Sequence, residues 1–198
     1  MIRFFFLFSA LATSALAAPA CLTKADAMSP GIHVESRNWG ASQFTVASDG
    51  KVTENIIEGD SWRYESLGSI FLLRYGPFKD GVFDPEKMDT ARYMVPLTDL
   101  PAIEKGMKWQ GDVSYTSASK PPWKAKMTVT AKSAPNLELG NCSYEAVMVL
   151  VAETHKDETS TTFFMFLPEF GFGIQTGFLS GMDMETYTPL SIRRVGDD

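Results

Sequence analysis

The chain has 198 residues, 44% of them hydrophobic, and a formal net charge of −6. This length fits one ordinary domain that can bury a core of its own. An acidic chain has no general attraction for nucleic acid or anionic lipid, so we expect no nucleic-acid partner. After the first twenty residues no stretch is long and apolar enough to cross a bilayer, and the sequence predicts no transmembrane segment.

The first twenty residues have the three parts of a secretory signal peptide. A positive start at Arg3 is followed by an apolar run from Phe4 to Ala12 and then by small residues over 15–20 that suit cleavage. We therefore predict a signal peptide over 1–20 and a single β domain over 21–198. The mature protein is expected in the periplasm or outside the cell.

The two cysteines, Cys21 and Cys142, are predicted to form a disulfide, because thiols pair in the oxidising compartments that exported proteins enter. The alternative is that Cys21 carries a lipid anchor at the mature N-terminus. Ala18-Pro19-Ala20 lacks the large aliphatic residue that a lipoprotein signal usually has three positions before its cysteine, so we favour the disulfide.

The first strands show a period of two, which places alternate side chains on opposite sheet faces. Residues 43–48 and 51–57 flank Asp49-Gly50 and predict a hairpin with a type I′ turn. The aromatic stretch 61–75 predicts either one long strand bent at Gly68 or two strands.

Residues 80–105 break this pattern with three prolines, and we expect a short helix near 85–93. Alternation returns strongly over 107–115 and 123–131, as in strands with one buried and one wet face.

The last third of the chain continues as strands. Residues 142–153 are apolar on both faces, which indicates a central strand covered twice. Further strands are predicted over 161–167, 172–179 and 187–195. Together the pattern predicts a mainly β, antiparallel domain of about nine or ten strands with at most one or two short helices, arranged as a curled half-barrel, barrel or sandwich.

No motif for catalysis, metal binding or a cofactor stands out. The chain has only His33 and His155, which are far apart and lie beside charged or turn residues, and two cysteines cannot build a structural zinc site. We therefore predict no catalytic residue, no metal and no cofactor. Carboxylates that converge only in space would escape this reading, so a hydrolase-type enzyme stays an alternative.

The late part of the chain is rich in phenylalanine. At least one face of its Phe-rich strand must therefore be covered from water. Alternation sends Phe163 and Met165 to one face and Phe164 and Phe166 to the other. The cover is either a second layer of the same chain, an apolar ligand in a concave sheet face, or a protein partner. The candidate ligand-binding residues are Trp109, Trp123, Met127, Phe163, Phe164 and Phe166.

Three segments carry a family resemblance: Gly106-Met107-Lys108-Trp109, the run Leu139-Gly140-Asn141-Cys142-Ser143-Tyr144, and Pro168-Glu169-Phe170-Gly171-Phe172. In these segments the C-terminal half resembles uncharacterised secreted β proteins of proteobacteria. The resemblance implies a curled sheet like those of envelope lipid and lipoprotein carriers, and it implies no activity.

The sequence thus predicts an exported bacterial envelope protein that binds without catalysis. Its partner would be an apolar or amphipathic small molecule or another envelope protein. A hydrolase-type enzyme and a purely structural assembly protein are the alternatives. The oligomeric state is left open.

Overall fold

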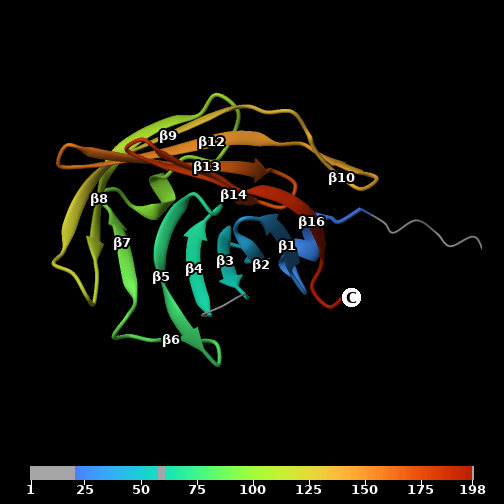
Figure 1. The fold of residues 1–198 in the computed structure, drawn as a ribbon, viewed down its shortest axis with the longest axis horizontal. Coiled ribbons are helices and arrows are strands. Elements are labelled where there is room, and N and C mark those ends of the chain that lie inside the picture. The colour runs from blue at the N-terminus through green and yellow to red at the C-terminus, as the bar shows by residue number, and fades with distance from the viewer. Residues whose placement is uncertain (1–20, 58–60, 198) are drawn as a thin grey trace, which may run out of the picture.

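The computed structural model describes residues 21–57 and 61–197, so the predicted signal peptide lies outside the described residues. Within these ranges the chain forms one 14-stranded antiparallel sheet and a separate two-stranded hairpin. The sheet curls on itself into a nearly closed barrel (Figure 1). The predicted mainly β, antiparallel fold is confirmed.

The elements follow one another closely along the chain. The first half contains α1 (Lys24–Met28), β1 (Ile32–Arg37), β2 (Gly40–Val46), β3 (Lys51–Ile56), β4 (Trp62–Leu67), β5 (Phe71–Lys79), β6 (Val82–Phe83), β7 (Asp89–Tyr93) and the 3-10 turn η1 (Leu97–Asp99). The second half contains β8 (Lys108–Thr116), β9 (Trp123–Ser133), β10 (Leu137–Leu139), β11 (Cys142–Tyr144), β12 (Val147–His155), β13 (Glu158–Leu167), β14 (Phe172–Ser180), β15 (Asp183–Thr186) and β16 (Thr188–Arg194).

The strand order around the barrel is β15-β14-β13-β12-β9-β8-β7-β5-β4-β3-β2-β1-β16, with β6 paired to β5. In Figure 1 the layer made by β9, β12, β13 and β14 lies across the layer made by β1 to β5, and β7 and β8 connect the two. The two ends of the sheet meet where β15 runs into β16, and the Tyr187 amide there donates a hydrogen bond of 2.9 Å to the Thr176 carbonyl of β14. The barrel is nearly closed here, because β15 and β16 are the two end strands of the sheet and follow each other in the chain.

The predicted count of nine or ten strands was wrong, because the described residues contain sixteen. The stretch 61–75 forms two strands, β4 and β5, since Gly68 and Ser69 both have positive φ, at 61° and 63°, and reverse the chain in two residues. The irregular stretch adds β6 and β7, and short strands such as β10 and β15 carry too few residues for a visible alternation.

The type I′ turn also lies elsewhere than predicted. Residues 43–48 and 51–57 do form the β2–β3 hairpin, but Gly50 alone of its turn has positive φ, at 79°. The Gly50 amide bonds the Ala47 carbonyl at 3.0 Å, which gives a four-residue turn. Positive φ at two adjacent residues, as in a type I′ turn, occurs instead at Gly68-Ser69 and at Asp80-Gly81.

The helix expected near residues 85–93 was wrong. Residues 89–93 form β7, which pairs antiparallel with both β5 and β8. Without β7, the backbone groups of β5 and β8 that bond to it would lack hydrogen-bond partners. This pairing with two strands therefore outweighs the weak local preference of the segment for a helix.

The core is divided between two apolar clusters. At one end of the barrel Phe44, Phe170 and Phe172 are almost completely buried, and the rings of Phe44 and Phe172 stack with centroids 4.5 Å apart. The other cluster fills the curve of β8, β9 and β12, with Val113, Val129 and Val149 fully buried. Ile70, Met127 and Val151 of this second cluster also line a cavity inside the barrel.

The predicted disulfide between Cys21 and Cys142 is present and ties the segment before α1 to β11. Arg194 of β16 holds the helix itself, with an ion pair of 2.7 Å to Asp26. The N-terminal segment is thus fastened at two places that are distant in the sequence.

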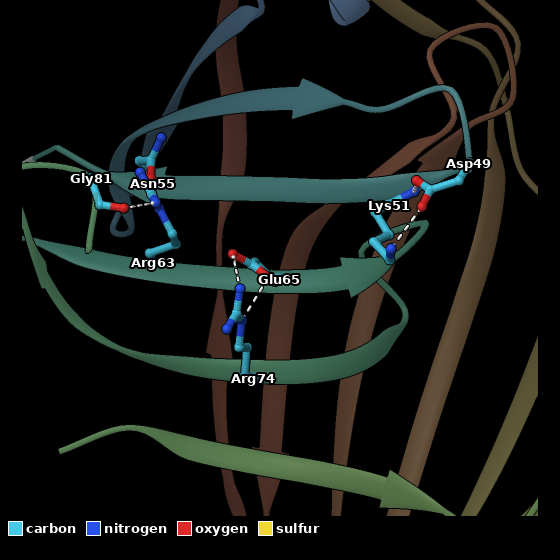
Figure 2. A network of polar contacts seen from close by, with 7 residues as sticks. All are labelled: Asp49, Lys51, Asn55, Arg63, Glu65, Arg74 and Gly81. Carbon is cyan, nitrogen blue, oxygen red and sulfur yellow. Dashed lines mark hydrogen bonds and ion pairs between the residues drawn. The ribbon is translucent and has the colours of Figure 1, made fainter. Parts of the chain in front are cut away.

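The outward face of β3, β4 and β5 carries paired charges (Figure 2). Arg74 contacts Glu65 at 2.7 Å, and Arg63 bonds Asn55 at 2.8 Å. These residues alternate with side chains that point into the barrel.

Across the described ranges, no helix combines the length and the apolar character that a membrane span needs.

Candidate functional site

A partly open cavity of about 270 Å³ lies between the β2–β5 side of the barrel and the β9–β12–β13 side. Its wall is made of inward-facing side chains from strands that are far apart in the sequence. The lining residues are Trp39, Glu54, Tyr64, Ser66, Ser69, Ile70, Leu72, Tyr75, Tyr115, Trp123, Met127, Val151, Glu153, Thr162, Phe164 and Gln175.

Aromatic rings form much of the wall. Tyr64 and Tyr75 lie directly opposite each other on β4 and β5 and stack with centroids 5.6 Å apart. Tyr115 and Trp123 do the same on β8 and β9 at 5.0 Å. Cross-strand aromatic pairs stabilise a sheet, and in this barrel the same four residues also line the cavity.

Glu54 brings a carboxyl group into this aromatic wall. It lies on β3 opposite Phe44 and Tyr64, and its Oε1 accepts a hydrogen bond of 2.9 Å from Ser42 Oγ. Burial raises the pKa of Glu54 from 4.5 to about 7, and hydrogen bonds from Ser42 and Trp39 oppose that rise only in part. The group is therefore poised to change charge near neutral pH.

Glu153 is the second carboxyl group on the wall. It lies on the inward face of β12 opposite Met127, and the Tyr115 hydroxyl donates a hydrogen bond to its Oε1. Burial raises the pKa of Glu153, while the Tyr115 hydrogen bond lowers it. Burial also raises the pKa of Tyr115, so that phenol stays neutral and remains a donor.

Ser69 adds a polar atom without a partner. Its Oγ is buried and makes no hydrogen bond to any described residue, although Ser69 is among the residues that line the cavity. An unpartnered buried hydroxyl is costly, and this oxygen has almost no accessible surface that a molecule in the cavity could contact.

The cavity continues toward an open groove of about 650 Å³ at one end of the barrel. Trp123 and Glu153 line both spaces, and the groove adds His155, Asp157 and Glu158. His155 Nδ1 lies 2.7 Å from the Lys124 carbonyl oxygen, so this ring is fixed against β9. We name it the entrance groove because it adjoins the cavity at Trp123 and Glu153, and carboxylates are prominent on its wall.

Three of the six candidate ligand-binding residues lie on the cavity wall. Trp123 and Met127 come from β9 and Phe164 from β13. Their strands are separated in the sequence, and the curl of the sheet brings these side chains together.

The other three candidates lie elsewhere. Trp109 packs edge-on against Phe71, with ring centroids 5.3 Å apart, and Phe166 is 7% exposed within the apolar core. Phe163 lies on the outward face of β13, where its neighbours across the strands are Leu150 and Gly177.

Sequence reasoning missed both carboxylates, although each left a signal. Val52, Glu54 and Ile56 share one face of β3, so a charged residue interrupts an apolar face. Glu153 likewise follows Val151 on the inward face of β12. An acid on the apolar face of a strand is costly to bury and indicates either a buried polar network or a site.

No family model and no curated protein matches this chain. Among solved structures, it is similar to the crystal structure of the hypothetical lipoprotein YmcC from Escherichia coli, with 12% identity and a TM-score of 0.43. That similarity covers 81% of this chain and 85% of the other.

Proposed function

We propose that this chain is an exported bacterial envelope protein that binds a small amphipathic molecule inside its barrel, without catalysis. The signal-peptide pattern of residues 1–20 supports export, and so does the Cys21–Cys142 disulfide. The barrel supports binding, because its interior is not completely filled by its own side chains.

The convergence of Trp123, Met127 and Phe164 on one cavity carries the proposal. Ligand sites are concave and mostly apolar, with a few polar groups that fix orientation, and they typically enclose about 300–1,000 Å³. A cavity of about 270 Å³ lies just below that range, so its occupant is a small molecule rather than a diacyl lipid.

A matched pair of substitutions on β13 tests the site. Thr162 lines the cavity, while its neighbour Thr161 points outward between Ala152 and Leu179. Thr162→Phe places a ring in the cavity, and Thr161→Phe adds the same ring outside. The neutral fluorescent probe N-phenyl-1-naphthylamine reports binding, and circular dichroism with thermal unfolding reports folding.

We expect the wild-type protein and Thr161→Phe to bind the probe equally, and the folded Thr162→Phe variant to lose most of this binding. Equal binding by all three proteins would place the probe outside the cavity and contradict the proposal. Native mass spectrometry of protein purified from its own host adds an independent test. A retained small molecule supports the proposal, and a stoichiometric protein partner instead supports an assembly role.

The second candidate function is a hydrolase, because the structure places Glu54 and Glu153 on one cavity wall. Hydrolases commonly use a pair of carboxyl groups, one as general acid and one as general base, and a raised pKa suits the general acid. A panel of chromogenic glycosides and esters tests this candidate. Turnover by the wild type that disappears in both Glu54→Gln and Glu153→Gln would favour the enzyme over the binding protein.

A further inference from the structure

The charges on the cavity wall are of one sign. Among the described residues that line the cavity, Glu54 and Glu153 carry carboxyl groups, and none is lysine, arginine or histidine. The nearby Arg63 and Arg74 point away from the barrel and are engaged on its outer face (Figure 2). Neither cavity carboxylate therefore has a cationic partner among the described residues.

The aromatic rings add to this negative character. The face of a tyrosine or tryptophan ring carries partial negative charge, and several such rings around a space form a cage that attracts organic cations. Trp39 and Trp123 supply the two tryptophans of the wall, with Tyr64, Tyr75 and Tyr115 between them. The aromatic and the acidic residues line the same space.

The chemical class of the occupant follows from these two observations. The ionised carboxylates would repel an anion, and a purely apolar molecule would leave them buried without a cationic partner, which is costly. A cation with apolar substituents satisfies both parts of the wall. We propose, building on the binding function above, that the occupant is a small organic ammonium ion, whose nitrogen lies near Glu54 or Glu153 and whose apolar part contacts Met127 and Phe164.

Two further features support this proposal. The entrance groove carries Asp157 and Glu158, which would raise the local concentration of a cation. Each carboxylate also has acceptor positions beyond the hydrogen bonds it makes to Ser42 or Tyr115.

Three probes of nearly the same shape and different charge test the inference on the full mature chain. Benzyltrimethylammonium is the cation, (2,2-dimethylpropyl)benzene is its neutral isostere, and phenylmethanesulfonate is the anion. Each is titrated directly by calorimetry and also by displacement of N-phenyl-1-naphthylamine. We expect the cation to bind at least about tenfold more tightly than the neutral isostere, a difference of ~1.4 kcal/mol, and the anion not to bind.

Neutral substitutions then identify the group that recognises the charge. Glu54→Gln and Glu153→Gln keep the shape of the side chain, and at least one should weaken cation binding about tenfold while the neutral probe binds as before. The control is Glu65→Gln, which removes a carboxylate of β4 that faces outward and should leave both affinities unchanged.

The outcomes separate this inference from the function on which it rests. If the neutral probe binds in the cavity but the ammonium ion binds no better than its isostere, the ammonium class is wrong and the binding function stands. Unchanged cation affinity in both glutamine variants also overturns the inference. If neither the neutral probe nor the cation binds, both proposals fail.

Discussion

Ser42 Oγ on β2 donates a hydrogen bond of 2.9 Å to Glu54 Oε1 on the neighbouring strand β3. This bond lies inside the barrel, where both residues share the inward face with apolar side chains. It lowers the pKa of Glu54, but burial outweighs it, and the balance leaves the pKa at about 7. The stability of the protein should therefore depend on the charge of this one group.

The first prediction is that stability falls as pH rises from about 4.5 to about 7 and that Glu54→Gln removes part of this fall. Between these values the unfolded chain has lost the Glu54 proton while the folded chain retains it, so folding binds a proton and is disfavoured by rising pH. At pH 8 the variant should be more stable than wild type by about 1–3 kcal/mol. Urea unfolding at pH 5 and pH 8 measures both effects, and an equal response of the two proteins to pH would refute the assignment.

The second prediction concerns pH and ligand. Binding of benzyltrimethylammonium should strengthen between pH 6 and pH 8, because Glu54 loses its proton in that range and a carboxylate attracts the cation. Tyr64, which faces Glu54 from β4, stays neutral, since burial raises its pKa to about 12. The pKa of Glu153 is also raised, so its titration acts in the same direction, and the phenols of Tyr75, Tyr93 and Tyr115 around it are neutral as well. Calorimetry across this range should show no pH dependence for the neutral isostere.

The third prediction is that the disulfide stabilises the fold without serving the site. Cys142→Ser should lower the free energy of unfolding by about 2–5 kcal/mol, because the cross-link closes a long loop in the unfolded chain. Probe binding by the variant that remains folded should be unchanged, since Cys142 does not line the cavity. Thiol labelling of denatured mature protein should find no free cysteine. A free Cys142 in such protein would instead support a lipid anchor at Cys21.

The fourth prediction compares two phenylalanines of β14. Phe172 is fully buried and stacks on Phe44, so Phe172→Ala should cost about 3–5 kcal/mol through lost transfer free energy and a new cavity. Phe178 is only partly buried and lies beside the entrance groove, so Phe178→Ala should cost clearly less. Urea unfolding of both variants tests the ranking. Equal costs would show that the groove end of β14 is as tightly packed as the other end.

Alternation along the chain was sufficient to predict an antiparallel β fold, because side chains on successive strand residues point to opposite faces. It also predicted that Phe163 and Phe164 separate, and the register of β12 and β13 places them on opposite faces. The disulfide could be predicted because only two cysteines were available and export favours pairing.

The candidate site could not be predicted in this way, because alternation along one strand says nothing about the distance to side chains on other strands. Glu54 and Glu153 are 99 positions apart in the sequence, and they line one cavity only because the sheet curls until the β3 and β12 sides of the barrel face each other. The curl arises from strand twist and from where each short turn reverses the chain, as at Gly68-Ser69, and both are properties of the paired sheet. The sequence therefore determined which face of each strand is apolar, and the tertiary structure decided which of those faces meet and which acids they enclose.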